Sequence, residues 1–250
     1  MNLVQKSAVA GAFAAAAMAV AAQAQAADVV TFAQYFEQKG VGADMRWVAS
    51  GKNGELMTIS SPTAKKLGAT KVVFSFLGDA FGGIKALFTL DAKETNTPVS
   101  IAGTTFDQSN LTGSFDFVST QAFTFDGTSY AAGTDLLKAT FFNKSDLFGK
   151  KGGTSGGFSG STGSGSTINY TSGVAGALPG VASDFSFTLT QVAPKFGYTA
   201  GKALNSFTAS STGSFSEAVP EPAVWGLMLT GFGMLGLVAR RQRRTGALAA

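Results

Sequence analysis

Apolar and polar residues alternate with a period of two through most of the chain between Lys71 and Ser216. Side chains that alternate in this way point to opposite faces of a β-strand, whereas a helix needs a period of 3.6 residues. The clearest alternation is in residues 184–190. There we expect Phe185, Phe187 and Leu189 to face a core, and Ser186, Thr188 and Thr190 to face solvent. Short runs of this kind, separated by glycine-rich turns, are typical of two packed sheets.

The chain contains 22 phenylalanines, many of them in these alternating runs. One phenylalanine-rich face on each strand would fill a dry core between two sheets. We therefore predict an all-β fold, an antiparallel β-sandwich with jelly-roll-like connections, as one domain over residues 27–218. Helices are expected only at the two ends of the chain.

Residues 149–165 are rich in glycine and serine. This composition disfavours packing and predicts a flexible loop. Within the segment, Gly153 to Gly157 match the G-x-S-x-G pattern of a nucleophile elbow. A nucleophilic Ser155 would need a base, usually a histidine, and the chain has none. The segment is therefore interpreted as a loop without a catalytic role.

The sequence has neither cysteine nor histidine. A packed core must therefore hold the domain without disulfides, and imidazole bases, imidazole metal ligands and thiolate sites are excluded. Oxygen ligands alone would suffice for calcium, which leaves calcium binding open, but no D-x-D-x-D loop occurs. We predict no cofactor, no metal site and no enzymatic activity.

The N-terminus has the composition of a secretory signal peptide. Lys6 precedes an alanine-rich apolar run from Ala8 to Ala22, and Ala24 and Ala26 form an A-x-A cleavage site, with Ala22 and Ala24 as an alternative site. Residues 1–26 are therefore expected to direct export and to be removed.

The C-terminus has three parts in a fixed order: Pro220, Glu221 and Pro222, then an apolar run over residues 223–239, then a basic cluster. The cluster comprises Arg240, Arg241, Arg243 and Arg244. The apolar run predicts a transmembrane helix, slightly short for a bilayer core of about 30 Å. The arginines are expected to stop transfer and to leave residues 245–250 in the cytoplasm. The prolines would keep the tripeptide extended, and Trp225 would lie at the membrane interface.

The net charge of +4 comes from these end segments. Without Lys6 and the four C-terminal arginines, 14 of the 19 basic residues remain, and without Glu221, 14 of the 15 acidic residues remain. The domain itself is neutral, so the charge does not indicate a nucleic-acid partner.

The C-terminal segment, residues 219–244, closely resembles the PEP-CTERM sorting signal, in the subtype with a tryptophan three residues after the second proline. The residues that carry the resemblance are Pro220, Glu221, Pro222, Trp225 and the terminal arginines. The same tail is also labelled an ice-binding protein C-terminal motif, which does not imply ice binding. The resemblance implies a membrane-embedded exosortase as partner, removal of the tail, and a mature protein at the cell surface or outside the cell.

The resemblance leaves the role of the domain open. The leading hypothesis is a non-enzymatic exported protein linked to exopolysaccharide or biofilm. A carbohydrate-binding module is the second hypothesis, with Trp47, Tyr130, Tyr170 and Tyr198 as a sugar-stacking platform. The third is a polysaccharide-processing enzyme that uses two carboxylates. The candidate carboxylates are Asp79, Asp91, Asp107, Asp116, Asp126, Asp135, Asp146 and Asp184.

Overall fold

The computed structural model describes residues 28–77, 83–94, 96–174, 178 and 181–219, and residues Val29–Val219 form one compact unit. Its elements are β1 (Asp28–Glu37), β2 (Met45–Ser50), β3 (Asn53–Thr58), β4 (Thr70–Phe76), β5 (Ile84–Glu94), β6 (Ser100–Ala102), β7 (Thr105–Ser119), β8 (Phe123–Phe125), β9 (Thr128–Tyr130), β10 (Asp135–Lys150), β11 (Gly156–Ser161), the 3₁₀ turn η1 (Thr162–Ser164), β12 (Thr167–Thr171), β13 (Val181–Ala193) and β14 (Phe207–Val219). The predicted signal peptide and transmembrane helix lie outside the described residues. Within them, no helix is long and apolar enough to cross a membrane.

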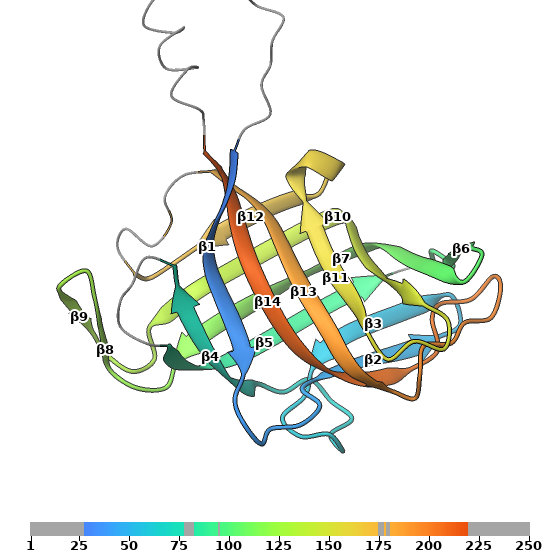
Figure 1. Cartoon of the computed structure of the whole chain (residues 1–250), viewed down its shortest axis with the longest axis horizontal. Helices are drawn as coiled ribbons and strands as arrows, with labels where there is room; N and C mark the ends of the chain where they lie inside the picture. The colour runs from blue at the N-terminus through green and yellow to red at the C-terminus, as the bar shows by residue number, and fades with distance from the viewer. Residues whose placement is uncertain (1–27, 78–82, 95, 175–177, 179–180, 220–250) are drawn as a thin grey trace, which may run out of the picture. The chain divides into compact units, whose positions relative to one another are not determined.

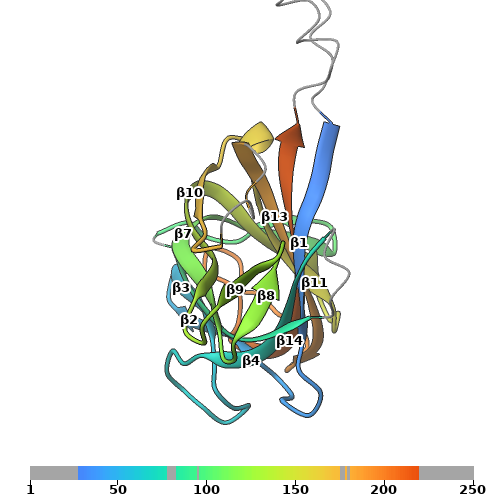
Figure 2. The same cartoon turned by 90° about the vertical axis from the view of Figure 1, so that its left-hand side faces the viewer.

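Eight strands pair around a closed path in the order in which they occur in the chain: β2, β3, β5, β7, β10, β11, β13 and β14, with β14 returning to β2. Every pair of strands along this path is antiparallel. β1 and β4 make a second bridge, from β14 to β5. Figure 1 shows β1, β13 and β14 crossing in front of β5, β7 and β10. In the view of Figure 2, β7 and β10 lie in one layer while β1, β13 and β14 lie in the facing layer.

The prediction of an antiparallel all-β fold with two layers is thus confirmed, but the jelly-roll-like connections are wrong. Apart from β14 and β2, strands that pair along the closed path follow one another in the chain with at most two other strands between them, whereas a jelly roll is built from Greek keys. The two layers are parts of one continuous sheet. The smaller strands sit on its margins: β6 pairs with β7, β12 pairs with β10, and β8 and β9 form a separate hairpin.

The core between the layers is aromatic. Phe88 and Phe117 stack with ring centroids 4.5 Å apart and an interplanar angle of 3°. Phe187 and Phe215 of the facing layer contact this pair, directly or through the ring of Tyr35. The alternation predicted for residues 184–190 is confirmed, since its apolar members are buried and the next hydroxyl residues are exposed.

At one end of the core a chain of hydrogen bonds links buried polar groups, although Oε2 of Glu94 has no partner among the described residues. The Trp47 indole Nε1–H donates to the carbonyl of Leu204 (2.9 Å), whose own N–H donates to Oε1 of Gln108 (3.1 Å). Nε2 of Gln108 donates to the carbonyl of Thr97 (2.7 Å), and the N–H of Thr97 donates to the buried carboxylate of Glu94. Buried polar groups are stable only when paired in this way. The network therefore seats the loop between β13 and β14 over the end of the core.

The glycine-rich segment is not a loop throughout, which corrects the prediction for residues 149–165. β10 continues to Lys150, and Gly156–Ser161 form β11 between β10 and β13. The glycines are needed there because aromatic rings occupy the space of a side chain. A Cβ on Gly157 would meet the Phe148 ring at 2.5 Å, and one on Gly160 would meet the Phe185 ring at 2.7 Å. Composition alone cannot distinguish such a strand from a flexible linker.

A sharper case is Gly113 of β7, where the backbone itself fills the space. A Cβ there would lie 2.0 Å from the carbonyl oxygen of Asp91 and 2.7 Å from Cα of Ala92, both on β5. Backbone cannot rotate away as a side chain can, so Gly113→Ala is expected to force β5 and β7 apart and to cost about 1–3 kcal/mol or more. Urea unfolding would measure this change. Gly163→Ala is the matched control, because its nearest neighbour would be at 3.4 Å. Equal stability of both variants would show that the two strands are less closely packed at this point.

Candidate functional site

The sorting and cleavage residues inferred from the sequence, Ala24, Ala26, the tripeptide, Trp225 and the arginines, lie outside the described residues. The structure does show how the chain enters and leaves the domain. The start of β1 and the end of β14 lie side by side at one end of the sheet (Figure 1), and Thr31 and Ser216 hydroxyls contact at 3.2 Å across the pair. β14 ends at Val219, so in the sequence Pro220 follows this strand directly, without a spacer.

The four aromatic residues considered as a sugar-stacking platform do not lie together. Trp47 is fully buried, and Tyr170 packs edge-on against Phe32 while its hydroxyl donates to the carbonyl of Asp184. Tyr130 belongs to the β8–β9 hairpin, and Tyr198 lies beneath the ammonium group of Lys151, 5.0 Å from the ring centroid. The platform expected from these residues is therefore not formed.

The carboxylates are distributed over several strands, but Asp107 and Asp146 influence each other. They lie half-buried on the neighbouring strands β7 and β10. Burial, and to a smaller degree the charge of Asp146, raises the pKa of Asp107 to about 6. Burial also raises the pKa of Asp146, against the effect of a hydrogen bond from the backbone of Asn110. Asp79 lies outside the described residues, and the described part of the chain holds no group of three residues that could ligate a metal.

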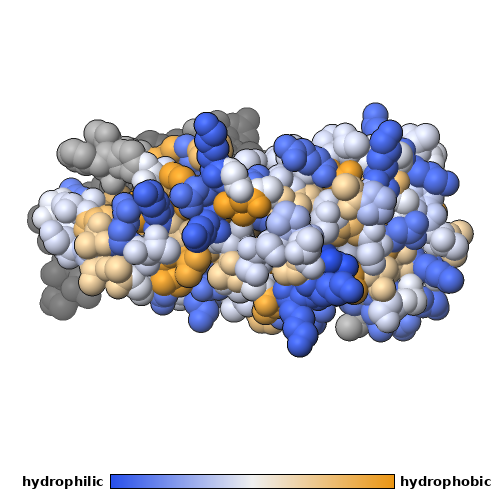
Figure 3. All heavy atoms as spheres, turned by 90° about the horizontal axis from the view of Figure 1, so that it is seen from below, coloured by the Kyte–Doolittle hydropathy of each residue, from blue (hydrophilic) through white to orange (hydrophobic). Residues whose placement is uncertain are grey.

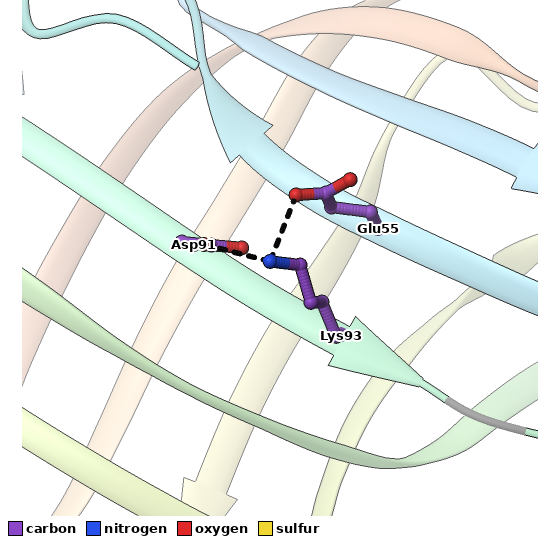
Figure 4. A network of polar contacts seen from close by, with 3 residues as sticks. All are labelled: Glu55, Asp91 and Lys93. Carbon is purple, nitrogen blue, oxygen red and sulfur yellow. Dashed lines mark hydrogen bonds and ion pairs between the residues drawn. The ribbon is translucent and has the colours of Figure 1, made fainter. Parts of the chain in front are cut away.

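A polar network on the outer face of β3 and β5 involves Glu55, Asp91 and Lys93 (Figure 4). Lys93 lies directly opposite Glu55 in the strand register, and its Nζ is 3.4 Å from Glu55 Oε1 and 3.1 Å from Asp91 Oδ2. The hydrogen bond and charge of Asp91, with the charge of Glu55, raise the pKa of Lys93. Such an exposed cross-strand pair contributes roughly 0.2–1 kcal/mol. The one ammonium group bridges carboxylates of both strands, so the network is best understood as support for the pairing of β3 with β5.

Two grooves lie on the described surface. The first, of about 220 Å³, adjoins the Lys93 network and is lined by Val48, Ser50, Asn53, Gly54, Glu55, Lys93 and Glu94. The second, of about 200 Å³, lies where β1 meets β14 and β13. It is lined by Gln34, Tyr35, Phe36, Ser186, Thr188, Thr212, Gly213 and Ser214. We call the second one the hydroxyl groove, because four of its lining residues carry hydroxyls that project outward and none is charged. The groove could not be predicted from the sequence, since residues 34–36 are distant in the chain from residues 186–214.

A broad apolar area on the surface could also bind a partner. Seen from below in Figure 3, apolar groups are scattered between hydrophilic ones, without a broad apolar area on that face. Scattered apolar groups are normal for a protein surface and do not indicate a docking site.

In the sequence, the all-β domain is followed directly by a segment with three ordered parts: the proline-flanked Glu221, an apolar run and a basic cluster. Residues 218–244 match the model of the PEP-CTERM protein-sorting motif. This chain therefore carries a PEP-CTERM sorting signal, a substrate of the exosortase type of enzyme. No curated protein matches the chain, and no solved structure does.

Proposed function

We propose that this protein is a non-enzymatic component of the cell surface or extracellular matrix, delivered there by exosortase processing and associated with exopolysaccharide or biofilm. The observation that carries the proposal is the sorting motif placed immediately after β14. The neutral domain, which is held by an aromatic core without disulfides, suits a protein that persists outside the cell. Asp107 and Asp146, the carboxylates that influence each other, line neither of the two grooves, which supports a role other than catalysis.

The sorting step would proceed from the chemistry of the three tail segments. The prolines would present Pro220 to Pro222 in an extended form at the outer membrane surface, where a membrane-embedded protease binds it. A helix over residues 223–239 would hold the precursor in the membrane, and the arginines would prevent it from being pulled through. Cleavage would then release the β-domain.

We predict that Glu221→Gln abolishes processing, because the enzyme recognises the tripeptide through this negative charge. The uncleaved precursor should accumulate in the inner membrane, as followed by fractionation and blotting against the β-domain. Glu55→Gln is the matched control, since it removes the same charge from a site where Asp91 still pairs with Lys93. Replacing all four terminal arginines by serine should instead weaken retention of the tail.

Mass spectrometry of the mature protein supplies the decisive comparison. The wild-type protein is expected to lack Arg240 to Arg244 and residues 1–26. Normal processing of Glu221→Gln, or a mature wild-type protein that keeps its arginines, would replace the sorting proposal by a simple membrane anchor.

A second candidate, a carbohydrate-binding module, is favoured by one observation: the uncharged hydroxyl groove on β1, β13 and β14. Saccharides bind through many hydrogen bonds to hydroxyl and amide groups, which is the chemistry that this groove presents.

A further inference from the structure

We propose that the hydroxyl groove binds a neutral, hydroxyl-rich polysaccharide chain laid across β14, β13 and β11. This inference deepens the proposed association with a surface polymer and rests on it. It assigns the binding to residues that differ from the four aromatic residues considered from the sequence.

The strand register arranges the hydroxyls in rows that cross the sheet. Ser159 pairs with Ser186, which pairs with Ser214, so three serines of adjacent strands lie in one row. In the next row Thr188 pairs with Thr212. Neighbouring strands are about 4.8 Å apart. A row across these strands therefore offers hydrogen-bonding groups at short, regular intervals to an extended chain.

These groups are available to a ligand. The side chains of Gln34, Ser186, Thr188, Thr212 and Ser214 have no hydrogen-bond partner within the described part of the chain. These hydroxyls already face outward from paired strands. Binding a ligand therefore requires little ordering of the backbone that carries them.

The backbone of β14 at the base of the groove is rigid, because it packs directly on the core. Gly213 has no side chain, and a Cβ there would meet the Phe187 ring at 2.4 Å and the Tyr35 ring at 2.5 Å. The rings therefore press against the inner side of the backbone that forms the floor. The backbone that carries Thr212 and Ser214, which flank Gly213, is held in place as a result.

Exposed aromatic rings lie at both sides of the rows. Phe36 of β1 lines the groove and is 48% exposed. On the other side Phe148 of β10, 44% exposed, lies over Gly157, which pairs with Thr188. Four strand spacings separate β10 from β1 along the path β10, β11, β13, β14 and β1, or roughly 19 Å. The C–H faces of sugar rings pack well on such rings, and this span suits several sugar units.

The charges select against an acidic polymer. No residue that lines the groove is charged. Where the rows reach β10, Asp146 lies opposite Ser159 and Asp107 lies opposite Phe148; the charge of Lys144 acts on Asp146, so two carboxylates stand against one ammonium group. Carboxylates at that end would repel a polyanion, whereas a neutral chain is unaffected. The groove beside Lys93 differs, because Glu55, Lys93 and Glu94 line it.

The test measures binding of the full-length chain, purified in detergent micelles, to three neutral probes and one acidic probe. The neutral probes are dextran, a soluble β-glucan and a soluble mannan, and the acidic probe is polygalacturonate. Saturable binding to at least one neutral probe is expected, with no binding to polygalacturonate. The double variant Thr188→Val/Thr212→Val keeps the shape of the groove and removes two hydroxyls. It should bind about tenfold more weakly, because two hydrogen bonds are lost.

Thr89→Val is the matched control, since Thr89 is a half-exposed threonine of β5, a strand that does not line the hydroxyl groove. Unchanged unfolding midpoints of both variants would show that binding alone is affected. The inference would be overturned if the wild-type protein bound none of the three neutral probes. It would also be overturned if the double variant bound as tightly as the wild type, or if the protein preferred polygalacturonate. The proposed sorting is tested separately by the processing of Glu221→Gln, which does not depend on sugar binding.

Discussion

Phe187→Ala is expected to lower the free energy of unfolding by roughly 3–5 kcal/mol, because the substitution leaves a large cavity at the centre of the core. Phe187 is fully buried, and its ring contacts Tyr35, Phe88 and Phe115, with centroid distances of 5.6, 5.8 and 5.3 Å. It also covers Gly213. The neighbouring strands are tied into a closed sheet, so they cannot collapse into the space. Urea unfolding monitored by circular dichroism would measure the loss.

Ser186→Ala is the control for this variant, since Ser186 is the adjacent residue on the exposed face of β13. We expect a change within about 0.5 kcal/mol, as for most surface substitutions. Comparable losses in the two variants would contradict the orientation of β13.

A second large effect concerns Asp44, a carboxyl group that is completely buried between β2 and β14. Its Oδ2 accepts a hydrogen bond from the Ser211 hydroxyl (3.0 Å), which in turn accepts one from Tyr35 (2.9 Å). Its Oδ1 has no partner within the described residues. Burial raises the pKa of Asp44 from 3.8 to about 7; the Ser211 hydrogen bond opposes this rise, and the charge of Glu37 adds to it.

The folded protein therefore binds the Asp44 proton more tightly than the unfolded chain does. This contribution to stability is complete below pH 3.8, declines as the pH rises, and is lost above about pH 7. Its size is roughly 4 kcal/mol, at about 1.4 kcal/mol for each pKa unit. The same direction holds for Asp107, whose pKa is raised to about 6. The domain should thus be more stable at pH 5 than at pH 8.

Asp44→Asn should raise the stability at pH 8 and flatten its dependence on pH between 4 and 7, because the amide is never charged. Its oxygen can still accept the Ser211 hydrogen bond. Asp126→Asn, in the exposed turn between β8 and β9, is the control, because it makes the same chemical change outside the core. Unfolding free energies at a series of pH values decide the matter. A variant at Asp44 with the slope of the wild type would show that this carboxyl does not titrate between the folded and unfolded states.

The sequence by itself determined the features that depend on local order. Pro220, Glu221, Pro222, Trp225 and the arginines form a signal that is read as a linear segment, and the family match over residues 218–244 agrees with it. The period of two likewise determined which residues of β13 face inward, since successive side chains of any strand point to opposite sides.

Tertiary structure alone decided how those strands are joined and what their outer faces carry. The alternation is the same in a jelly roll and in a closed meander, so pairing β14 with β2 could not be inferred from it. The glycines of β11 are explained only by the rings of Phe148 and Phe185 that come to lie against them. Asp44 resembles any polar residue of a loop until Ser211 and Tyr35 enclose it. The hydroxyl groove joins residues 34–36 with residues 186–214 because packing a shared core, and not proximity in the chain, brings β1, β13 and β14 together.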